Sequence, residues 1–186
     1  IPWEIVWGPD DHIWMTERFG RVSRVNPKTG NQQVLLDLSG EVYERSETGM
    51  LGMALHPDFD NSPHVFIAYT YLSGNNIRER LVRFNYDGSQ LIAADTLIEN
   101  IIGNNTHVGA RVIILPDNTL LMSTGDAQNR SLPQNKSSVV GKILRLNLDG
   151  SIPTDNPNPN SYVWSFGHRN AQGLWRAPNG KIYSSE

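Results

Sequence analysis

Cysteine is absent from the 186-residue chain, so neither a disulfide framework nor thiolate chemistry is available to it. Long apolar runs are also missing, since no window approaches the roughly 18 apolar residues that a membrane helix needs. We therefore expect no membrane span. No signal-like leader precedes Ile1, but Ile1-Pro2-Trp3 is typical of the middle of a structural element, so the missing leader says nothing about export.

An excess of charge of one sign is missing as well. The chain has 16 Lys and Arg against 19 Asp and Glu, a formal net charge of −3, and no basic run longer than an isolated pair. This balance argues against a nucleic acid or an anionic membrane surface as the main partner and favours a small or neutral molecule. With 38% hydrophobic residues, the chain can bury the core of one domain or of part of a larger one.

What the sequence does contain is a repeat with two parts. A Pro-Asp or Pro-Asn pair, a few polar residues and a short apolar strand recur at Pro9, Pro57, Pro116 and Pro178. A second pattern, a strand that ends in Asn before a turn, recurs at Asn26, Asn85 and Asn147. Two patterns that recur together every 48 to 62 residues indicate a repeat architecture.

The repeated segments have the composition of strands. They are short, rich in Val, Ile, Leu, Tyr and Trp, and separated by turn residues, and no stretch has a sustained helical period with caps at both ends. The expected strands cover residues 13–16, 22–25, 65–71, 81–84, 111–115, 119–124 and 142–146. Asp-Gly and Asn-Gly pairs at 87–88, 149–150 and 179–180 suit tight hairpins.

Antiparallel sheets of about four strands that repeat radially form a β-propeller, which is the fold we predict for this all-β chain. A β-sandwich also has many short strands, but it gives no reason for the Pro-Asp-strand unit to occur four times. At roughly 60 residues per blade the chain holds about three blades, whereas propellers close with four to eight. We therefore expect residues 1–186 to form a partial β-propeller, a single domain truncated at both ends.

Four clusters of glycines and polar residues are candidates for a functional site. The first is RSETGMLGMALHPDF (45–59), where Gly49 and Gly52 are expected to bracket a tight turn. The others are NNTHVGARVIILPDN (104–118), STGDAQNR (123–130) and GHRNAQG (167–173).

Three of the motifs carry a family resemblance. HPDF, GKILRLNLDGSIP-x-DNP (141–157) and GHRN-x-QG together resemble the soluble glucose/aldose sugar dehydrogenases, the glucose/sorbosone dehydrogenase family. The resemblance covers essentially the whole chain, and the motifs are long and of low degeneracy. It implies a six-bladed propeller that uses pyrroloquinoline quinone (PQQ) and calcium, with this chain as its N-terminal half.

The resemblance also implies residue roles. His107 falls on the family's catalytic base, and Arg169 and Asn170 fall on residues at the cofactor, with Arg169 also catalytic. Gln128 and Glu47 fall at or near positions that hold the sugar. The calcium ligands, and the Lys and Arg residues that pair with PQQ carboxylates, are implied beyond Glu186, so we expect no metal ligand in this chain and an inactive chain in isolation.

The implied reaction is oxidation of an aldose at C1 to the lactone, with hydride transfer to PQQ. A neutral imidazole suits removal of the hydroxyl proton, and Arg169 suits charge that develops on the reduced quinone oxygen. Calcium would polarise the quinone carbonyl as a Lewis acid. The family also implies an external electron acceptor and a periplasmic or secreted protein.

Structural roles compete with these. Without the family pattern, His107 would be interpreted as a strand-end histidine, and Asp126 is expected to cap the turn after Gly125. Three residues depart from the family pattern. Thr106 replaces an Asp, Ala171 stands where Pro is frequent, and Ala110 replaces a Gly, which matters if that position has a positive φ. The alternative function is a non-catalytic propeller that binds a protein or glycan, as in hedgehog-interacting proteins.

Overall fold

The computed structural model describes the backbone of residues 1–186 and the side chains of residues 1–92 and 95–186. It contains three four-stranded antiparallel sheets and one hairpin. The first sheet comprises β1 (Pro2–Trp7), β2 (Ile13–Glu17), β3 (Arg21–Val25) and β4 (Gln32–Asp37). The second comprises β5 (Met50–Leu55), β6 (His64–Ser73), β7 (Asn76–Tyr86) and β8 (Leu91–Ile102). The third comprises β9 (Gly109–Ile114), β10 (Thr119–Thr124), β11 (Lys142–Asn147) and β12 (Val163–Phe166), and the hairpin comprises β13 (Gly173–Arg176) and β14 (Ile182–Ser185).

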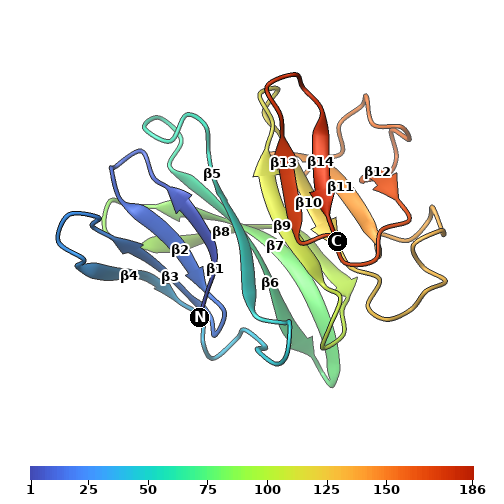
Figure 1. Cartoon of the computed structure of the whole chain (residues 1–186), viewed down its shortest axis with the longest axis horizontal. Coiled ribbons are helices and arrows are strands. Elements are labelled where there is room, and N and C mark those ends of the chain that lie inside the picture. The colour runs from blue at the N-terminus through green and yellow to red at the C-terminus, as the bar shows by residue number, and fades with distance from the viewer.

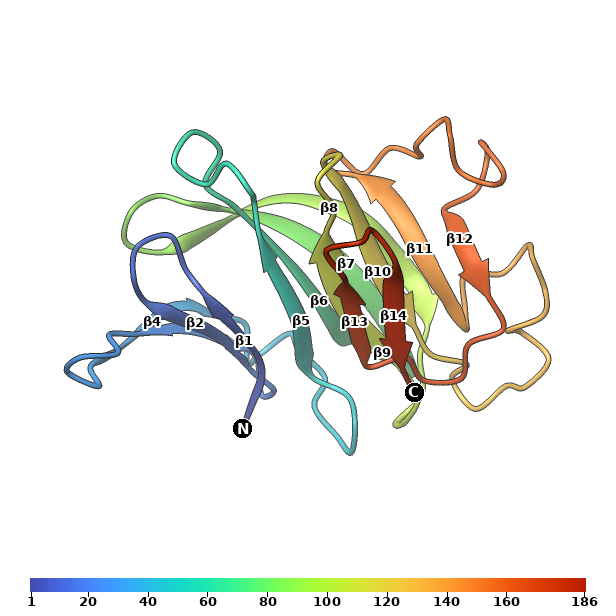
Figure 2. The same ribbon diagram turned by 45° about the horizontal axis from the view of Figure 1, so that its top comes forward.

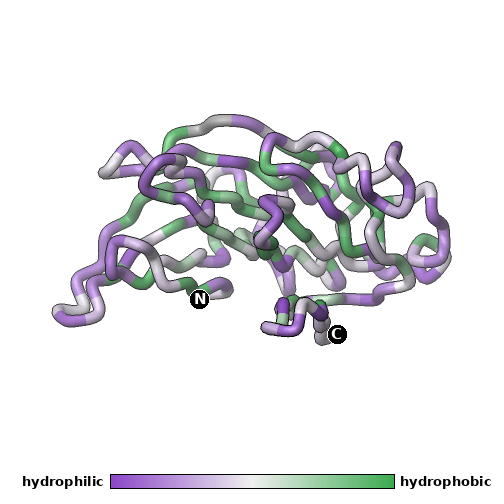
Figure 3. Tube along the Cα trace, turned by 90° about the horizontal axis from the view of Figure 1, so that it is seen from above, coloured by the Kyte–Doolittle hydropathy of each residue, from purple (hydrophilic) through white to green (hydrophobic). Residues whose placement is uncertain are grey.

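Each sheet is a meander in which consecutive strands pair, and the sheets fan out beside one another as blades (Figure 1). The first strands of the blades, β1, β5, β9 and β13, are neighbours along the inner side of this fan. Figure 2 shows the resulting arch, and Figure 3 shows that both termini lie on its open side. The chain is therefore a partial β-propeller, as predicted from its repeats.

The two repeated sequence patterns mark equivalent places in the blades. The four prolines lie in the turns after β1, β5, β9 and β13, and the three asparagines lie at the ends of β3, β7 and β11. All of the strands expected from the sequence are present, but β1, β4, β5, β8, β12 and β13 were not anticipated as such. Among the described residues there is no helix that could span a membrane.

Blades pack face to face, so their middle strands are apolar on both sides. Leu120, Met122 and Leu144 belong to the core between the second and third blades, whereas Leu121 and Ile143 point the opposite way, toward the hairpin. A second large core, which includes Trp14, Val22, Met53, Ile67 and Phe84, joins the first and second blades. At about 25 cal/mol per Å² of buried apolar surface, these interfaces are the main stabilising contribution.

One prediction about the first motif was wrong. Gly49 and Gly52 do not bracket a turn, because β5 begins at Met50 and runs through Gly52. A Cβ atom on Gly52 would lie 2.0 Å from the carbonyl oxygen of Ala110 on β9. Glycine is needed here because two inner strands approach backbone to backbone, not because the chain reverses.

Arg111 ties the inner strands together. Its guanidinium pairs with Glu4 on β1, donates from Nε to the Gln172 carbonyl at 2.7 Å, and lies 4.2 Å from the centre of the Trp3 ring. Burial raises the pKa of Glu4, although Arg111 opposes that shift. Arg111 therefore connects the first blade, the third blade and the linker before the hairpin.

Candidate functional site

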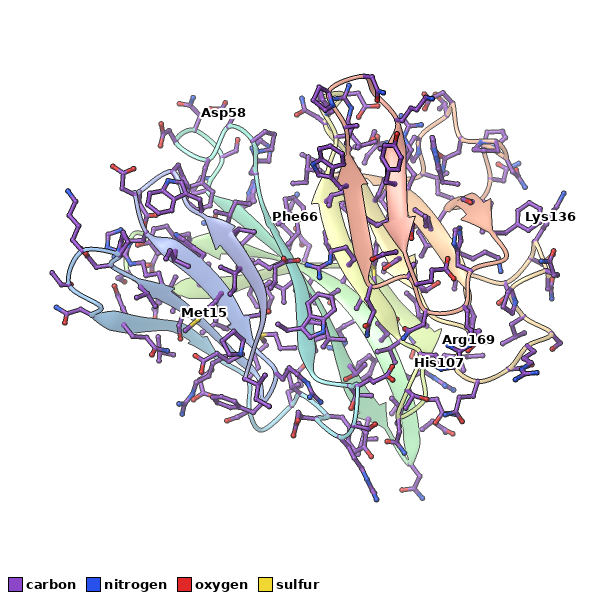
Figure 4. The ribbon with its side chains drawn as sticks, in the orientation of Figure 1. Met15, Asp58, Phe66, His107, Lys136 and Arg169 are labelled. Atoms are coloured by element: carbon purple, nitrogen blue, oxygen red, sulfur yellow. The ribbon has the colours of Figure 1, made fainter. Side chains whose placement is uncertain are left out.

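The candidate residues come from segments that meet at one end of the blades. Glu47 precedes β5, His107 precedes β9, and Asn170 precedes β13, while Asp126 follows β10. Because the inner strands run the same way, the linkers that precede them gather at one end of the fan, beside the ends of the second strands. Figure 4 shows His107 and Arg169 close together there, and Asp126 N–H donates to the Arg169 carbonyl at 2.8 Å.

His107 is held by three hydrogen bonds from three different residues. Its backbone N–H donates to Glu47 Oε2 at 2.8 Å, and its carbonyl accepts from Ala127 N–H at 3.1 Å. Its ring Nδ1 lies 2.8 Å from Asp126 Oδ1. The backbone and one ring nitrogen are therefore fixed, and the side chain is 16% exposed.

The backbone around His107 is in the left-handed region. His107 has φ 58°, Ala110 has 69°, and Ala127 and Gln128 opposite have 49° and 62°. For residues other than glycine this conformation costs roughly 1–2 kcal/mol each, and such strain gathers at functional sites. Gly125 permits the arrangement, since a Cβ there would lie 1.7 Å from the His107 carbonyl oxygen. Ala110, which stands where the family pattern has a glycine, therefore does have a positive φ.

The Asp126 carboxylate determines which ring nitrogen of His107 carries the proton. Asp126 is almost buried and only accepts hydrogen bonds when ionised, so Nδ1 donates its proton to Oδ1. Nε2 then keeps its lone pair and can accept a proton. The same Oδ1 accepts from Gln128 N–H at 2.7 Å, so the predicted turn cap is confirmed. Sequence analysis missed the second contact, to His107.

Asn170 and Glu47 connect three of the linkers. Asn170 Oδ1 accepts from Gly109 N–H at 3.1 Å, while its Nδ2 donates to Glu47 Oε2 at 3.2 Å. The same Glu47 oxygen receives His107 N–H. Glu47 and Asn170, both predicted from the sequence, therefore contact each other directly. Each also binds a backbone N–H of the segment that contains His107.

The Glu186 side chain stabilises the turn that contains Arg169. Arg169 N–H donates to Glu186 Oε2 at 2.9 Å, and His168 Nδ1 lies 2.5 Å from Oε1. Burial raises the pKa of Glu186, but the hydrogen bonds from Arg169 and His168 outweigh it, and the pKa lies below its usual value. Glu186 was not anticipated as a site residue, and no sequence signal pairs it with His168.

The Arg169 side chain is exposed and lines a hollow of about 350 Å³ with Arg130, Gln134, His168 and Asp126. In the part of the chain whose side chains are described, neither arginine has a carboxylate partner. Two unneutralised guanidinium groups at one hollow suit a planar, anionic ligand, because guanidinium binds carboxylates bidentately.

Gln128 is exposed beside His107, and its side-chain amide donates to Thr106 Oγ1. Thr106 is the residue that departs from the family's Asp, so this departure has a structural partner. The five sequence-predicted residues thus lie on four neighbouring segments at one end of the blades.

The buried side chain of Lys142 binds the backbone of the loop that contains Asp126 and Gln128. Its Nζ donates to the carbonyls of Leu132 at 2.9 Å, Pro133 at 3.0 Å and Val140 at 2.7 Å, and the residue is fully buried. Burial lowers the pKa of Lys142. Because a neutral amine has only two N–H donors, three carbonyl acceptors require the ammonium form.

The residues present fit PQQ better than they fit a calcium ion. PQQ is a planar tricarboxylate, and Arg169 and Arg130 give the hollow two positive charges beside the Asp126 carboxylate, which is bonded to His107. No group of three His, Asp or Glu side chains that could hold a metal ion occurs among the described residues. Any metal chemistry at this end of the blades needs ligands other than such a cluster.

A fan of four-stranded meanders with a His–Asp pair where its linkers meet defines the class of protein: a partial β-propeller with a hydrogen-bonded His107–Asp126 pair at one end of its blades. The chain belongs to the Glucose / Sorbosone dehydrogenase family, whose model matches residues 1–186. The family resemblance found in the sequence is thereby confirmed.

Individual relatives agree with the family. The chain is 35% identical over 217 residues to quinoprotein glucose dehydrogenase B of Acinetobacter calcoaceticus, covering all of this chain and 45% of the relative. It is 27% identical over 190 residues to the aldose sugar dehydrogenase YliI of Escherichia coli, covering 95% of this chain and 50% of the relative. The PQQ-bound aldose sugar dehydrogenase of Streptomyces coelicolor superposes with a TM-score of 0.90 at 35% identity, covering all of this chain and 56% of that one. The chain thus spans about half the length of these relatives.

Proposed function

We propose that the native polypeptide containing these residues oxidises an aldose at C1 to the lactone, with PQQ as the hydride acceptor. The observation that supports this most directly is the His107–Asp126 pair, which leaves Nε2 free to accept a proton at the end of the blades where Arg169 and Asn170 lie. Sugar dehydrogenases among the relatives support the substrate class.

In this proposal His107 Nε2 accepts the proton of the C1 hydroxyl. Asp126 keeps the ring in the required tautomer and stabilises the imidazolium that forms. Gln128 contacts the sugar through its exposed amide, which Thr106 orients. Arg169 faces the ligand hollow with a charge that cannot be removed by deprotonation, and Asn170 fixes the backbone at Gly109.

PQQ, when bound, supplies a quinone that takes up hydride. Arg169 and Asn170 are the residues of this chain that we assign to hold it, with Arg130 adding positive charge at the hollow. We further propose that calcium is used, through ligands beyond Glu186. An external electron acceptor and a periplasmic or secreted location complete the proposal, as expected from the family.

The test is replacement of His107 by Gln in the native polypeptide, reconstituted with PQQ and Ca²⁺ and assayed by dye reduction with glucose and other aldoses. We expect kcat to fall by about 10²- to 10⁴-fold, the range for loss of a general base. Retention of kcat within threefold would refute His107 as the base. A wild-type protein that folds and binds PQQ yet oxidises no aldose would instead favour the non-catalytic propeller.

A further inference from the structure

We infer that Glu47 is a positioning residue, which fixes the backbone of His107 and the side-chain amide of Asn170. The inference rests on the proposed function, because it says how the proton acceptor of that reaction is kept in place. It assigns Glu47 a different role from the sugar contact predicted from the sequence.

A single oxygen of Glu47 makes both connections. Oε2 accepts from His107 N–H at 2.8 Å and from Asn170 Nδ2 at 3.2 Å. Glu47 also donates its own N–H to the Asn105 carbonyl at 3.0 Å. Glu47, which belongs to a different linker, therefore forms hydrogen bonds with both ends of segment 105–107.

Glu47 is itself held firmly enough to act as an anchor. Thr48 Oγ1 closes the turn around it by accepting from Arg45 N–H at 2.8 Å and donating to the Arg45 carbonyl at 2.7 Å. Arg18, just after β2, donates to the carbonyls of Ser46 and Thr48. These hydrogen bonds to the backbone on either side of Glu47 restrict where its carboxylate can lie.

The anchor matters because His107 occupies a strained backbone conformation. At φ 58° the residue lies in the left-handed region, which is unfavourable for a residue other than glycine. The hydrogen bond to Glu47 holds the backbone in that region, and a hydrogen bond to a charged acceptor is stronger than one to a neutral acceptor. Without it, the peptide before His107 is free to rotate, and Nε2 shifts although Asp126 still binds the other ring nitrogen.

The geometry commits one of the two carboxylate oxygens of Glu47 to the protein itself. A carboxylate oxygen has two lone pairs, and both on Oε2 have donors. Among the described residues Oε1 has no hydrogen-bond partner, and moving the side chain toward a ligand would break the two bonds at Oε2 that shape the site.

Three variants of the native polypeptide separate the two roles. Glu47→Ala removes the acceptor, Glu47→Asp keeps the charge but is one methylene too short, and Glu47→Gln keeps an acceptor oxygen at the same reach. Glu99→Ala is the control, because Glu99 is exposed on β8 and forms no ion pair among the residues whose side chains are described. Kinetics with two aldoses are measured together with hydrogen exchange of the His107 amide in the protein without PQQ.

A positioning residue predicts that E47A and E47D lower kcat by about 10- to 100-fold, with KM changed less than about twofold for both sugars. Exchange of the His107 amide should rise at least about tenfold, whereas E47Q should stay within about threefold of wild type in kcat and exchange. Unchanged exchange in E47A, a rise in KM that differs between the sugars, or an equal effect of E99A would overturn the inference. If wild-type protein oxidises no aldose, the proposed function fails while the exchange result still decides the role of Glu47.

Discussion

Glu79 offers the sharpest test of the packing between blades. It lies in the middle of β7, paired across the sheet with Thr70 on β6 and Ile101 on β8, and is 1% exposed. Its Oε1 has no hydrogen-bond partner among the residues described by the structure. Burial raises the pKa of this carboxyl well above its usual value.

The raised pKa fixes the sign of a pH effect on stability. Below the unfolded-state pKa of about 4.3, Glu79 is protonated in both states and gives no pH dependence. As pH rises above that value, the unfolded chain releases the proton while the folded protein retains it. The free energy of unfolding then falls by about 1.4 kcal/mol per pH unit until the folded-state pKa is reached.

Glu79→Gln removes this dependence while keeping the shape of the side chain. We expect the unfolding free energy of E79Q minus that of wild type to increase by about 1.4 kcal/mol per pH unit between pH 5 and 6. The assay is urea unfolding of the native polypeptide at several pH values, with the exposed Glu99→Gln as control. A difference that does not change with pH would refute the assignment of a buried, protonated Glu79.

Three further predictions concern the site and its loop. Asp126→Asn should lower kcat by about 10²- to 10⁴-fold in the dye-reduction assay, because the imidazolium of His107 loses its carboxylate; a change below threefold would contradict the pairing. Lys142→Met should lower the free energy of unfolding by about 3–5 kcal/mol in urea titrations, since three carbonyls lose a cationic donor, and a loss under 1 kcal/mol would show that the ammonium contributes little. The isolated 186-residue chain should neither bind PQQ tightly nor oxidise glucose, and turnover by this chain with PQQ and Ca²⁺ would contradict that expectation.

The fold was accessible from sequence because propeller blades repeat. Turn prolines and terminal asparagines recur in register, and these mark the hairpins that the structure contains. β5 was misjudged because its glycines resemble turn residues. The physical reason for Gly52, the close approach of Ala110 on another strand, involves a contact between residues far apart in the sequence.

The site was accessible only in part. Family motifs identified His107, Arg169 and Asn170, and the structure brings their segments together. The partners that hold these residues, Asp126 and Glu186, were not found, since a carboxylate that caps a turn has the same local sequence whether or not a histidine lies beside it. Such pairings depend on how linkers from different blades meet, and one sequence carries no direct record of that.

The position of the site residues has a consequence for how such a protein acquires function. Each of them lies in a segment outside the strands, and the bonds that shape the site run between linkers of successive blades. One blade alone contains no such junction, because the junction forms only where two blades are neighbours. The functional unit of this architecture is the boundary between neighbouring copies, so the linkers can diverge in sequence and chemistry while the sheets that separate them stay alike.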